Sequence, residues 1–164
     1  MSERFEYQME RLNQVFKVDE RIPQLNELSL YLQSQTGFIL KPVHGIVSQR
    51  EFLNCFAFKT FPSTQYLRHT KTPDYTPEPD IVHEIVGHIP MFADKDVAVL
   101  FCLTKELSHK IGLISLGASD EEIEKLGALY WYTLEFGACK ENGKNLGYGA
   151  GIASSISEIE VKSF

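Results

Sequence analysis

Hydrophobic residues recur every three or four positions near the start of the chain, the spacing that places side chains on one face of a helix. The first such segment follows Ser2 and Glu3 and predicts an amphipathic helix. A second helix is expected to open at Pro23, because proline is tolerated in a first turn, and to close at Gly37. The positions expected to face inward are Phe5, Met9, Leu12, Phe16, Leu25, Leu28 and Leu32.

Polar residues that can cap a helix mark further helix starts. Ser48–Glu51 and Ser119–Glu122 have the capping-box pattern, in which a serine and a glutamate satisfy backbone N–H groups of the first turn. They predict a third helix to about Thr60 and a long helix from about Asp120 to Gly137. The acids and prolines of Thr76–Asp80 indicate another helix start.

Few segments favour strands. Phe38–Pro42 has an extended pattern, and the glycines between positions 143 and 151 indicate an irregular stretch. A last short helix is expected to begin near Ser154 or Ser155. Because helices dominate, the predicted fold class is mainly α with a few short strands.

Composition is that of an ordinary globular domain. The 164 residues suit one domain, and 43% hydrophobic with 23% charged residues is typical of a soluble protein. A formal net charge of −6 gives no support for a nucleic-acid or membrane partner, since both favour basic patches. No apolar stretch approaches the length of a transmembrane helix, and the N-terminal residues do not have the pattern of a signal peptide.

Cysteine usage points to a reducing compartment. The three cysteines are odd in number, far apart and without a CxxC pair, so a disulfide framework and a zinc site are both disfavoured. We interpret Cys55, Cys102 and Cys139 as small buried hydrophobic residues, and the domain as cytosolic.

The segment His83–His88 is the first candidate for chemistry. Its histidines are five positions apart, whereas the HExxH motif of zinc peptidases has them four apart on one helix face. On an ideal α-helix a separation of five turns the rings about 140° away from each other. One shared metal therefore requires the helix to bulge or end between them, and Gly87 with Pro90 supplies a break. Two satisfied histidines at a helix end are an equal alternative.

Glu135 favours the metal hypothesis. It is the only charged residue between Leu126 and Cys139, and a carboxylate in such an apolar setting is costly unless it is paired, protonated or bound to a cation. One interpretation is an ion pair with a lysine or arginine from elsewhere. The other is a third metal ligand, because two histidines and one carboxylate form the facial triad of non-haem iron(II) oxygenases.

Two acids flank the histidines. Asp80 precedes His83 by about one helical turn, so it is placed to accept a hydrogen bond from the imidazole or to cap the helix N-terminus. Glu84 is expected to face either the metal pocket or solvent.

Five segments together resemble the aromatic amino acid hydroxylases, and the resemblance runs in unbroken order from about Phe5 to Glu160. These segments are TQYLRH (64–69), YTPEPDIVHEIVGH (75–88), IGLISLGASDEEIEKL (111–126), LYWYTLEFGACK (129–140) and YGAGIASSISE (148–158). The resemblance implies a monooxygenase of the phenylalanine 4-hydroxylase type that uses Fe(II), tetrahydrobiopterin and O2. It implies that His83, His88 and Glu135 hold the iron.

The resemblance also assigns roles to other residues. It implies that Glu84 lies near the pterin and an iron-bound water, with Tyr130 also close to the cofactor, and that Arg68 grips the carboxylate of the aromatic amino acid substrate. The pterin would be bordered by Gly45, Ile46, Val47, Ser48 and Gln49 through the backbone and by Phe52 through ring stacking. The substrate would be held by Thr76, Gly151 and Ser154, with Pro79 and Trp131 shaping the aromatic pocket.

The same resemblance predicts what this chain lacks or changes. Residues 1–164 would form a partial catalytic domain, without a regulatory domain or the C-terminal oligomerisation helix of the family. An insertion is expected around Val99–His109. Lys59 and Pro62 stand where the family has arginine and histidine, and Gln49 stands where it has serine.

Alternative functions remain open at this point. Tyrosine or tryptophan hydroxylation is the nearest alternative, and GASDEEIEKL leans towards the tyrosine enzymes. A non-catalytic fragment that binds iron or associates with a complete subunit is an alternative of another class. A zinc peptidase is disfavoured by the histidine spacing.

Overall fold

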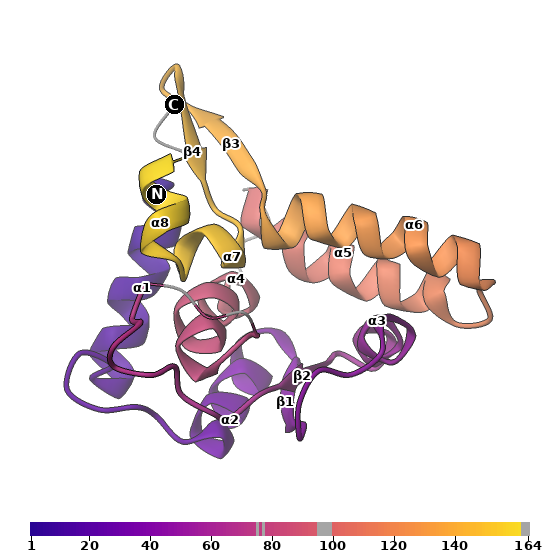
Figure 1. Cartoon of the computed structure of the whole chain (residues 1–164), viewed down its shortest axis with the longest axis horizontal. Helices are drawn as coiled ribbons and strands as arrows, with labels where there is room; N and C mark the ends of the chain where they lie inside the picture. The colour runs from indigo at the N-terminus through magenta and orange to yellow at the C-terminus, as the bar shows by residue number, and fades with distance from the viewer. Residues whose placement is uncertain (75, 77, 95–99, 162–164) are drawn as a thin grey trace.

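The computed structural model describes residues 1–74, 76, 78–94 and 100–161. Figure 1 shows a mainly helical molecule in which α5 and α6 run side by side as an arm, while β3 and β4 project from another side. Within the described parts no helix is long and apolar enough to cross a membrane.

The elements in chain order are α1 (Glu3–Phe16), α2 (Leu25–Thr36), β1 (Ile39–Pro42), α3 (Gln49–Ala57), β2 (Thr60–Ser63), the π-helix η1 (His83–His88), α4 (Ile89–Ala93), α5 (Leu100–Ser115), α6 (Asp120–Tyr130), the π-helix η2 (Trp131–Glu135), β3 (Ala138–Glu141), β4 (Lys144–Gly147), α7 (Ala150–Ala153) and α8 (Ile156–Val161).

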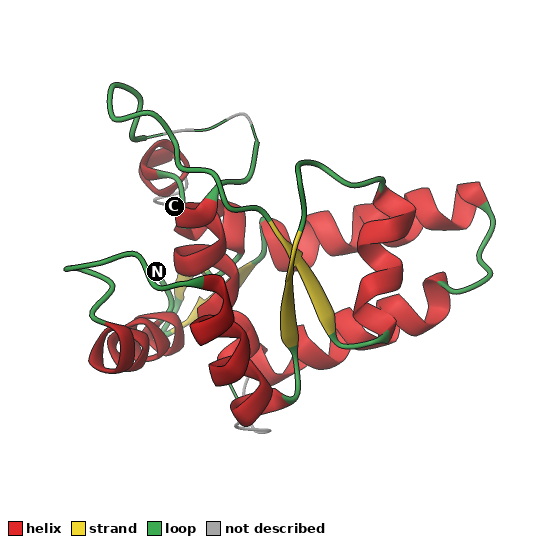
Figure 2. Ribbon diagram, turned by 90° about the horizontal axis from the view of Figure 1, so that it is seen from below, coloured by secondary structure: helices red, strands yellow, loops and turns green. Residues whose placement is uncertain are grey.

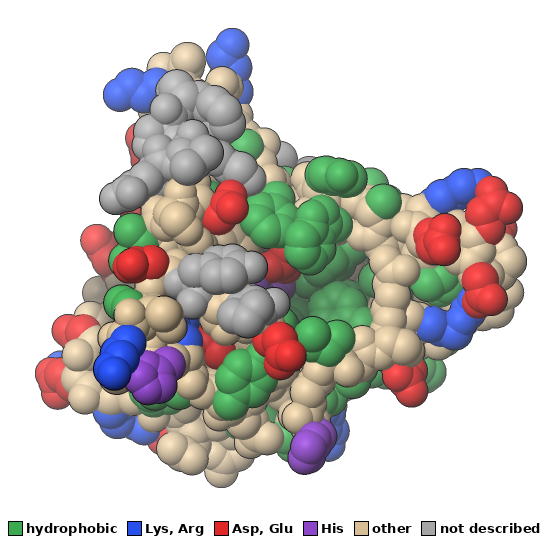
Figure 3. Space-filling view, in the orientation of Figure 1, with side chains coloured by type: hydrophobic (Ala, Val, Ile, Leu, Met, Phe, Trp, Pro, Cys, Tyr) green, Lys and Arg blue, Asp and Glu red, His purple; other side chains and the backbone are tan. Residues whose placement is uncertain are grey.

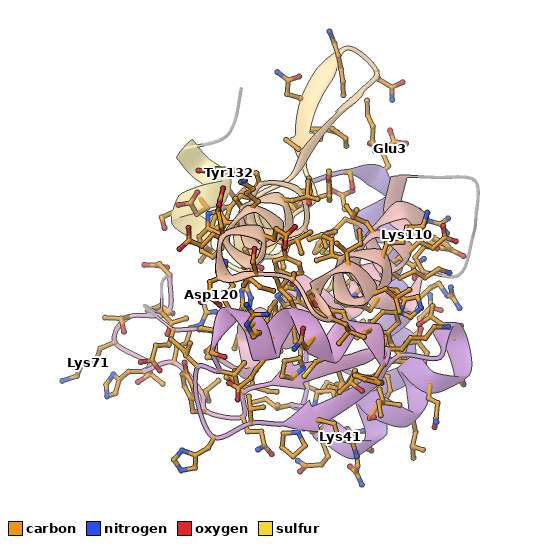
Figure 4. All side chains as sticks on the ribbon, turned by 90° about the vertical axis from the view of Figure 1, so that its right-hand side faces the viewer. Glu3, Lys41, Lys71, Lys110, Asp120 and Tyr132 are labelled. Atoms are coloured by element: carbon orange, nitrogen blue, oxygen red, sulfur yellow. The ribbon has the colours of Figure 1, made fainter. Side chains whose placement is uncertain are left out.

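The capping residues act as the sequence predicts. The hydroxyls of Ser48 and Ser119 each accept a hydrogen bond from a first-turn N–H, and both capping boxes are complete. Gly37 closes α2 with a φ of 81°, a left-handed conformation that glycine adopts without strain. Arg50 of α3 pairs at 2.6 Å with Asp120, the first residue of α6, whose position Figure 4 labels.

Several element boundaries differ from prediction. α2 begins at Leu25, with Gln24 as its N-cap, whereas the predicted start was Pro23. α3 stops at Ala57 rather than near Thr60, because strand β2 follows it. The helix expected from the Thr76–Asp80 pattern begins only at Ile81. The long helix expected to reach Gly137 changes from α to π at Trp131.

The strands of the described residues form two small sheets (Figure 2). β1 and β2 are parallel, joined through α3, and pair from Ile39 with Thr60 to Pro42 with Ser63. β3 and β4 form an antiparallel hairpin that the sequence analysis missed. Its two-residue turn is Asn142-Gly143, with φ values of 50° and 79°, and Asn-Gly is the pair that such turns favour.

Side chains from widely separated segments meet in one aromatic core. The ring of Phe56 is fully buried and packs within 5.4 Å of Tyr130 and 6.2 Å of Phe92, measured between ring centroids. The ring of Phe61 lies 4.6 Å from that of His88, so the core continues directly into the histidine pair. The predicted inward residues Phe5, Leu12, Phe16, Leu28 and Leu32 are buried, while Met9 and Leu25 are partly buried.

The predictions for the cysteines and for the insertion fall partly on residues that the structure does not describe. Cys55 and Cys139 are free and half-buried rather than buried, whereas the side chain of Cys102 lies outside the described residues. Of the expected insertion at Val99–His109, position 99 also lies outside them, and the segment from Leu100 onwards belongs to α5.

We predict that Phe56→Ala lowers the free energy of unfolding by about 3–5 kcal/mol, because it leaves a cavity at the centre of the aromatic core. Phe58→Ala is the matched control, since the Phe58 side chain is 71% exposed, and it should change stability by no more than about 0.5 kcal/mol. Urea unfolding followed by circular dichroism measures both. Equal losses in the two variants would contradict this description of the core.

Candidate metal and cofactor site

The two histidines meet because the helix that carries them widens into a π turn. In η1 the N–H of Ile89 bonds to the carbonyl of Glu84, a step of five residues rather than four. Residues five apart then lie on one side of the helix, and the Nε2 atoms of His83 and His88 are 2.9 Å apart. The predicted bulge is confirmed. The helix does not end there, since Pro90 lies in the first turn of α4.

Glu135 reaches the same point from a second π turn. The N–H of Phe136 bonds to the carbonyl of Trp131 at 2.9 Å, again a step of five residues. The carboxylate places one oxygen 3.3 Å from Nε2 of His83 and the other 3.3 Å from Nε2 of His88. Its ion-pair partners in the described structure are these histidines, so pairing with a lysine or arginine is not what holds it. All three side chains are buried and could hold one metal ion.

Glycines allow α7 to approach both π turns. A Cβ on Gly87 would lie 2.8 Å from the carbonyl oxygen of Ala150, and one on Gly149 would lie 2.4 Å from that of Glu135. Neither distance is tolerated without movement of the backbone. A Cβ on Gly151 would lie 3.1 Å from a carboxylate oxygen of Glu135. The glycine-rich segment that the sequence predicts to be irregular therefore packs directly against the two π turns that carry the candidate metal ligands.

Ser154 sets the orientation of the His83 ring. Its hydroxyl donates to the carbonyl of Ala150 at 2.8 Å and lies 2.7 Å from Nδ1 of His83. Since the hydroxyl hydrogen is already used, Nδ1–H is the donor to Ser154, and Nε2 presents its lone pair to His88 and Glu135. Burial, followed by the charge of His88, lowers the pKa of His83 to about 4, which keeps this ring neutral at physiological pH.

Asp80 caps the helix and does not bond the His83 ring. Its Oδ1 accepts the backbone N–H of His83 at 2.9 Å, so of the two interpretations the helix cap is confirmed, while the ring nitrogens of His83 contact Ser154 and His88 instead. Its carboxylate also binds the guanidinium of Arg68 through two bonds of 2.8 and 2.9 Å. Burial alone would raise the pKa of Asp80, but these hydrogen bonds outweigh it and the pKa is lowered.

Arg68 is held on several sides. Besides the two bonds to Asp80, its Nη1 donates to the carbonyl oxygens of Pro73 and Ser154, each at 3.0 Å. Four of its five N–H groups are thus used within the chain. The guanidinium is fixed in place with one donor remaining.

Three buried polar atoms near the triad have no hydrogen-bond partner among the described residues. They are Oε2 of Glu84, Nδ1 of His88 and the hydroxyl of Tyr130. Burial raises the pKa of Glu84 to about 7 and that of Tyr130 well above its usual value. Unpaired buried polar groups are rare in folded proteins, so this cluster indicates a place for a polar ligand or ordered water.

The three residues that carry these atoms line a cavity of about 620 Å³. Figure 3 shows the corresponding face, where hydrophobic side chains gather around a hollow between the α5–α6 arm and the rest of the molecule. Of the residues assigned to the site from sequence, those that line the cavity are Gly45, Ile46, Val47, Gln49, Phe52, Arg68, Thr76, Pro79, His83, Glu84, His88, Tyr130, Trp131, Glu135, Gly151 and Ser154. Residues that sequence reasoning missed on this wall include Thr64, Phe61 and Glu158.

Ser48 is the exception among the assigned residues. Its hydroxyl accepts from the N–H of Glu51 and lies 2.7 Å from a carboxylate oxygen of the same residue, so it caps α3. Its neighbour Gln49 lies across α6, where a Cβ on Gly127 would come within 1.6 Å of the Gln49 amide nitrogen. Glycine at position 127 therefore makes room for a side chain on the cavity wall.

The aromatic residues of the site differ in burial. Phe52 packs edge-to-face on Phe56, Phe61 and Tyr130 at centroid distances of 4.9 to 5.9 Å, so it belongs to the core while its ring also lines the cavity. Trp131 is 52% exposed and contacts Phe136 at 4.8 Å, which places it at the rim.

Comparison with known proteins identifies the family. The sequence profile described as "Biopterin-dependent aromatic amino acid hydroxylase" matches residues 1–162. The chain belongs to this family. It is 52% identical to Homo sapiens tyrosine 3-monooxygenase over 141 residues, which cover 86% of this chain and 25% of that protein. It is 51% identical to Bos taurus phenylalanine-4-hydroxylase over 142 residues, covering 87% and 30%.

A solved relative confirms the fold. The chain aligns with Chromobacterium violaceum phenylalanine hydroxylase, in a structure with bound iron(III) and 7,8-dihydrobiopterin, with a TM-score of 0.81 and 32% identity. The alignment covers 96% of this chain and 54% of that one. The chain thus spans about a quarter to a third of the curated relatives and about half of this structure, and it corresponds to part of the hydroxylase catalytic fold.

We predict that Glu84→Gln changes the pH dependence of stability in the metal-free chain. The pKa of Glu84 is about 7 in the fold against a normal 4.5, so the fold favours the neutral acid. The contribution of the protonated Glu84 carboxyl to the free energy of unfolding is therefore fully present below about pH 4.5 and is lost as the pH rises through 7. The wild type should lose about 3 kcal/mol relative to Glu84→Gln between pH 4.5 and 8, measured by urea unfolding across this range. Parallel profiles for the two proteins would contradict the assigned pKa.

Proposed function

We propose that this chain binds Fe(II) through His83, His88 and Glu135 and takes part in pterin-dependent hydroxylation of an aromatic amino acid. The observation that carries the proposal is the convergence of two imidazole nitrogens and a carboxylate, 2.9 to 3.3 Å apart, from two separate π turns. Phenylalanine is the substrate that we favour. The relatives divide between tyrosine and phenylalanine at 52% and 51% identity, while the solved relative named above acts on phenylalanine.

The donor set fits iron(II). Two neutral imidazoles and one carboxylate, with no thiolate, are the ligands of mononuclear non-haem iron sites that keep positions open for other ligands. Ser154 orients one imidazole, as ligating histidines require. Because the Glu135 carboxylate is buried, its negative charge is costly to desolvate, and a bound cation would offset that cost together with the two histidines.

The cavity fits a planar cofactor beside the metal. Its wall combines the loop at 45–47 with the ring of Phe52 and the unpaired oxygen of Glu84. A relative with the same fold holds 7,8-dihydrobiopterin, which supports a pterin as the ligand. A reduced pterin and iron(II) together would supply the activation of O2 that ring hydroxylation needs.

The chain's own residues orient the reactants and exclude water. Arg68, fixed by Asp80, would direct its remaining N–H towards the substrate carboxylate, with Thr76, Gly151 and Ser154 nearby. Pro79 and Trp131 would border the aromatic ring from the rim. Glu84 would accept a hydrogen bond from cofactor or water through its free oxygen, and the Tyr130 hydroxyl would lie beside it. We place these roles in a partial catalytic domain formed by residues 1–164.

Iron stoichiometry tests the proposal first. We predict about one Fe(II) per wild-type chain after anaerobic loading, and loss of specific binding in Glu135→Gln, which keeps the side-chain shape but removes the ligand charge. Glu78→Gln is the control, because Glu78 lies on the same cavity wall but is exposed and outside the triad. Metal analysis after gel filtration measures all three.

Two results would redirect the proposal. Full binding in Glu135→Gln would reject the triad. Iron binding without tetrahydropterin-dependent product from phenylalanine, tyrosine or tryptophan would retain the metal site but show that this chain alone is not catalytic.

Arg68→Lys tests the substrate side. Lysine keeps a positive charge beside Asp80 but cannot form the two-bonded fork that fixes the arginine, whereas alanine would leave a buried carboxylate unpaired. We expect the KM for the amino acid to rise about tenfold or more while iron stoichiometry stays unchanged. Steady-state kinetics at saturating pterin measures the first, and an unaltered KM would reject the role of Arg68.

A further inference from the structure

Thr64 binds one oxygen of Glu84 through two groups. Thr64 directly follows β2 and is 4% exposed. Its backbone N–H and its hydroxyl both lie 3.0 Å from Oε1 of Glu84. The hydroxyl also lies 2.8 Å from the carbonyl oxygen of Pro79. One residue therefore links the end of a strand, the helix of the histidines and the cavity wall at Pro79.

This arrangement leaves the two carboxylate oxygens of Glu84 in different situations. Oε1 is held by Thr64, while Oε2 is buried and has no partner among the described residues, and Glu84 itself lines the cavity. The backbone of Glu84 is fixed as well, since its N–H bonds to the carbonyl of Asp80 at 3.0 Å. With one end of the carboxylate restrained, the other end is available to a ligand in a defined direction.

We infer that Thr64 is a positioning residue, which holds Glu84 so that Oε2 accepts a hydrogen bond from an N–H group of the reduced pterin. The inference rests on the proposed function and extends it to a residue that binds neither metal nor cofactor. Any residue at position 64 would offer the backbone N–H. The hydroxyl has one hydrogen, which it shares between Oε1 of Glu84 at 3.0 Å and the carbonyl oxygen of Pro79 at 2.8 Å. This shared hydrogen bond adds a second contact to Oε1 and ties it to Pro79, so the hydroxyl is the part of Thr64 that restrains rotation of the carboxylate.

Valine and serine separate the hydroxyl from the shape of the side chain. Thr64→Val keeps the branched shape and the backbone N–H but removes the hydroxyl, whereas Thr64→Ser keeps the hydroxyl and removes a methyl group. If Thr64 only stabilised the fold, Thr64→Val would lower the unfolding midpoint without a selective effect on the pterin. If it positions Glu84, the effect must appear in pterin binding and must depend on Glu84.

The experiment measures binding of 7,8-dihydrobiopterin by calorimetry, and the KM values and kcat with tetrahydrobiopterin, on the iron-loaded chain. We expect Thr64→Val to weaken pterin affinity about tenfold, the value of one hydrogen bond to a charged or strongly polar group, with iron stoichiometry and the amino acid KM within about twofold of wild type. Thr64→Ser should recover most of the affinity. In a Glu84→Gln background, Thr64→Val should add little, because its effect acts through the carboxylate.

The outcomes distinguish this inference from the function on which it rests. A wild-type chain that binds no pterin overturns both. A chain that binds pterin while Thr64→Val equals wild type, or while Thr64→Val has the same effect with and without Glu84, overturns the positioning role alone.

Discussion

The site depends on a local widening of two helices. On regular α-helices the histidines, five residues apart, would diverge by about 140°, and Glu135 would be displaced from its place at the helix end. The π turns η1 and η2 remove both problems by lengthening the hydrogen-bonded step to five residues. Such turns are rare and occur often at functional sites. Here close packing of the glycine segment 147–151 against both turns supports them, since any side chain at Gly149 would meet the backbone of Glu135.

Burial of so many polar groups requires a second set of contacts, and these bind distant segments into one unit. Asp80 joins Arg68 to the helix of the histidines, Ser154 joins α7 to the ring of His83, and Thr64 joins β2 to Glu84. Each contact satisfies a group that would otherwise be costly to bury. The same contacts therefore orient the candidate ligands and connect the loop at 64–80 to the rest of the fold. Three residues that keep an unpaired buried atom among the described residues, Glu84, His88 and Tyr130, line the cavity.

Sequence reasoning found what depends on residue type and spacing. Capping boxes, the glycine that closes α2 and the need for a bulge between the histidines all follow from local rules, and the structure confirms them. Contacts between residues far apart in the sequence were harder to predict. The partner of Asp80 could not be chosen, because Arg68 comes near it only through the folded loop between them. Strand β2 was missed because it is four residues long and contains Pro62, and the hairpin was missed although Asn142-Gly143 signals it.

The comparison with relatives limits where substrate choice can reside. Over the matched region the chain is as similar to a tyrosine hydroxylase as to a phenylalanine hydroxylase, so the residues common to both cannot separate the two substrates. Discrimination must come from the positions that differ within this region or from the parts of the relatives that the chain does not match. Gln49 and Gly127 line the same cavity wall in this chain, and the absence of a Cβ at position 127 makes room for the Gln49 side chain.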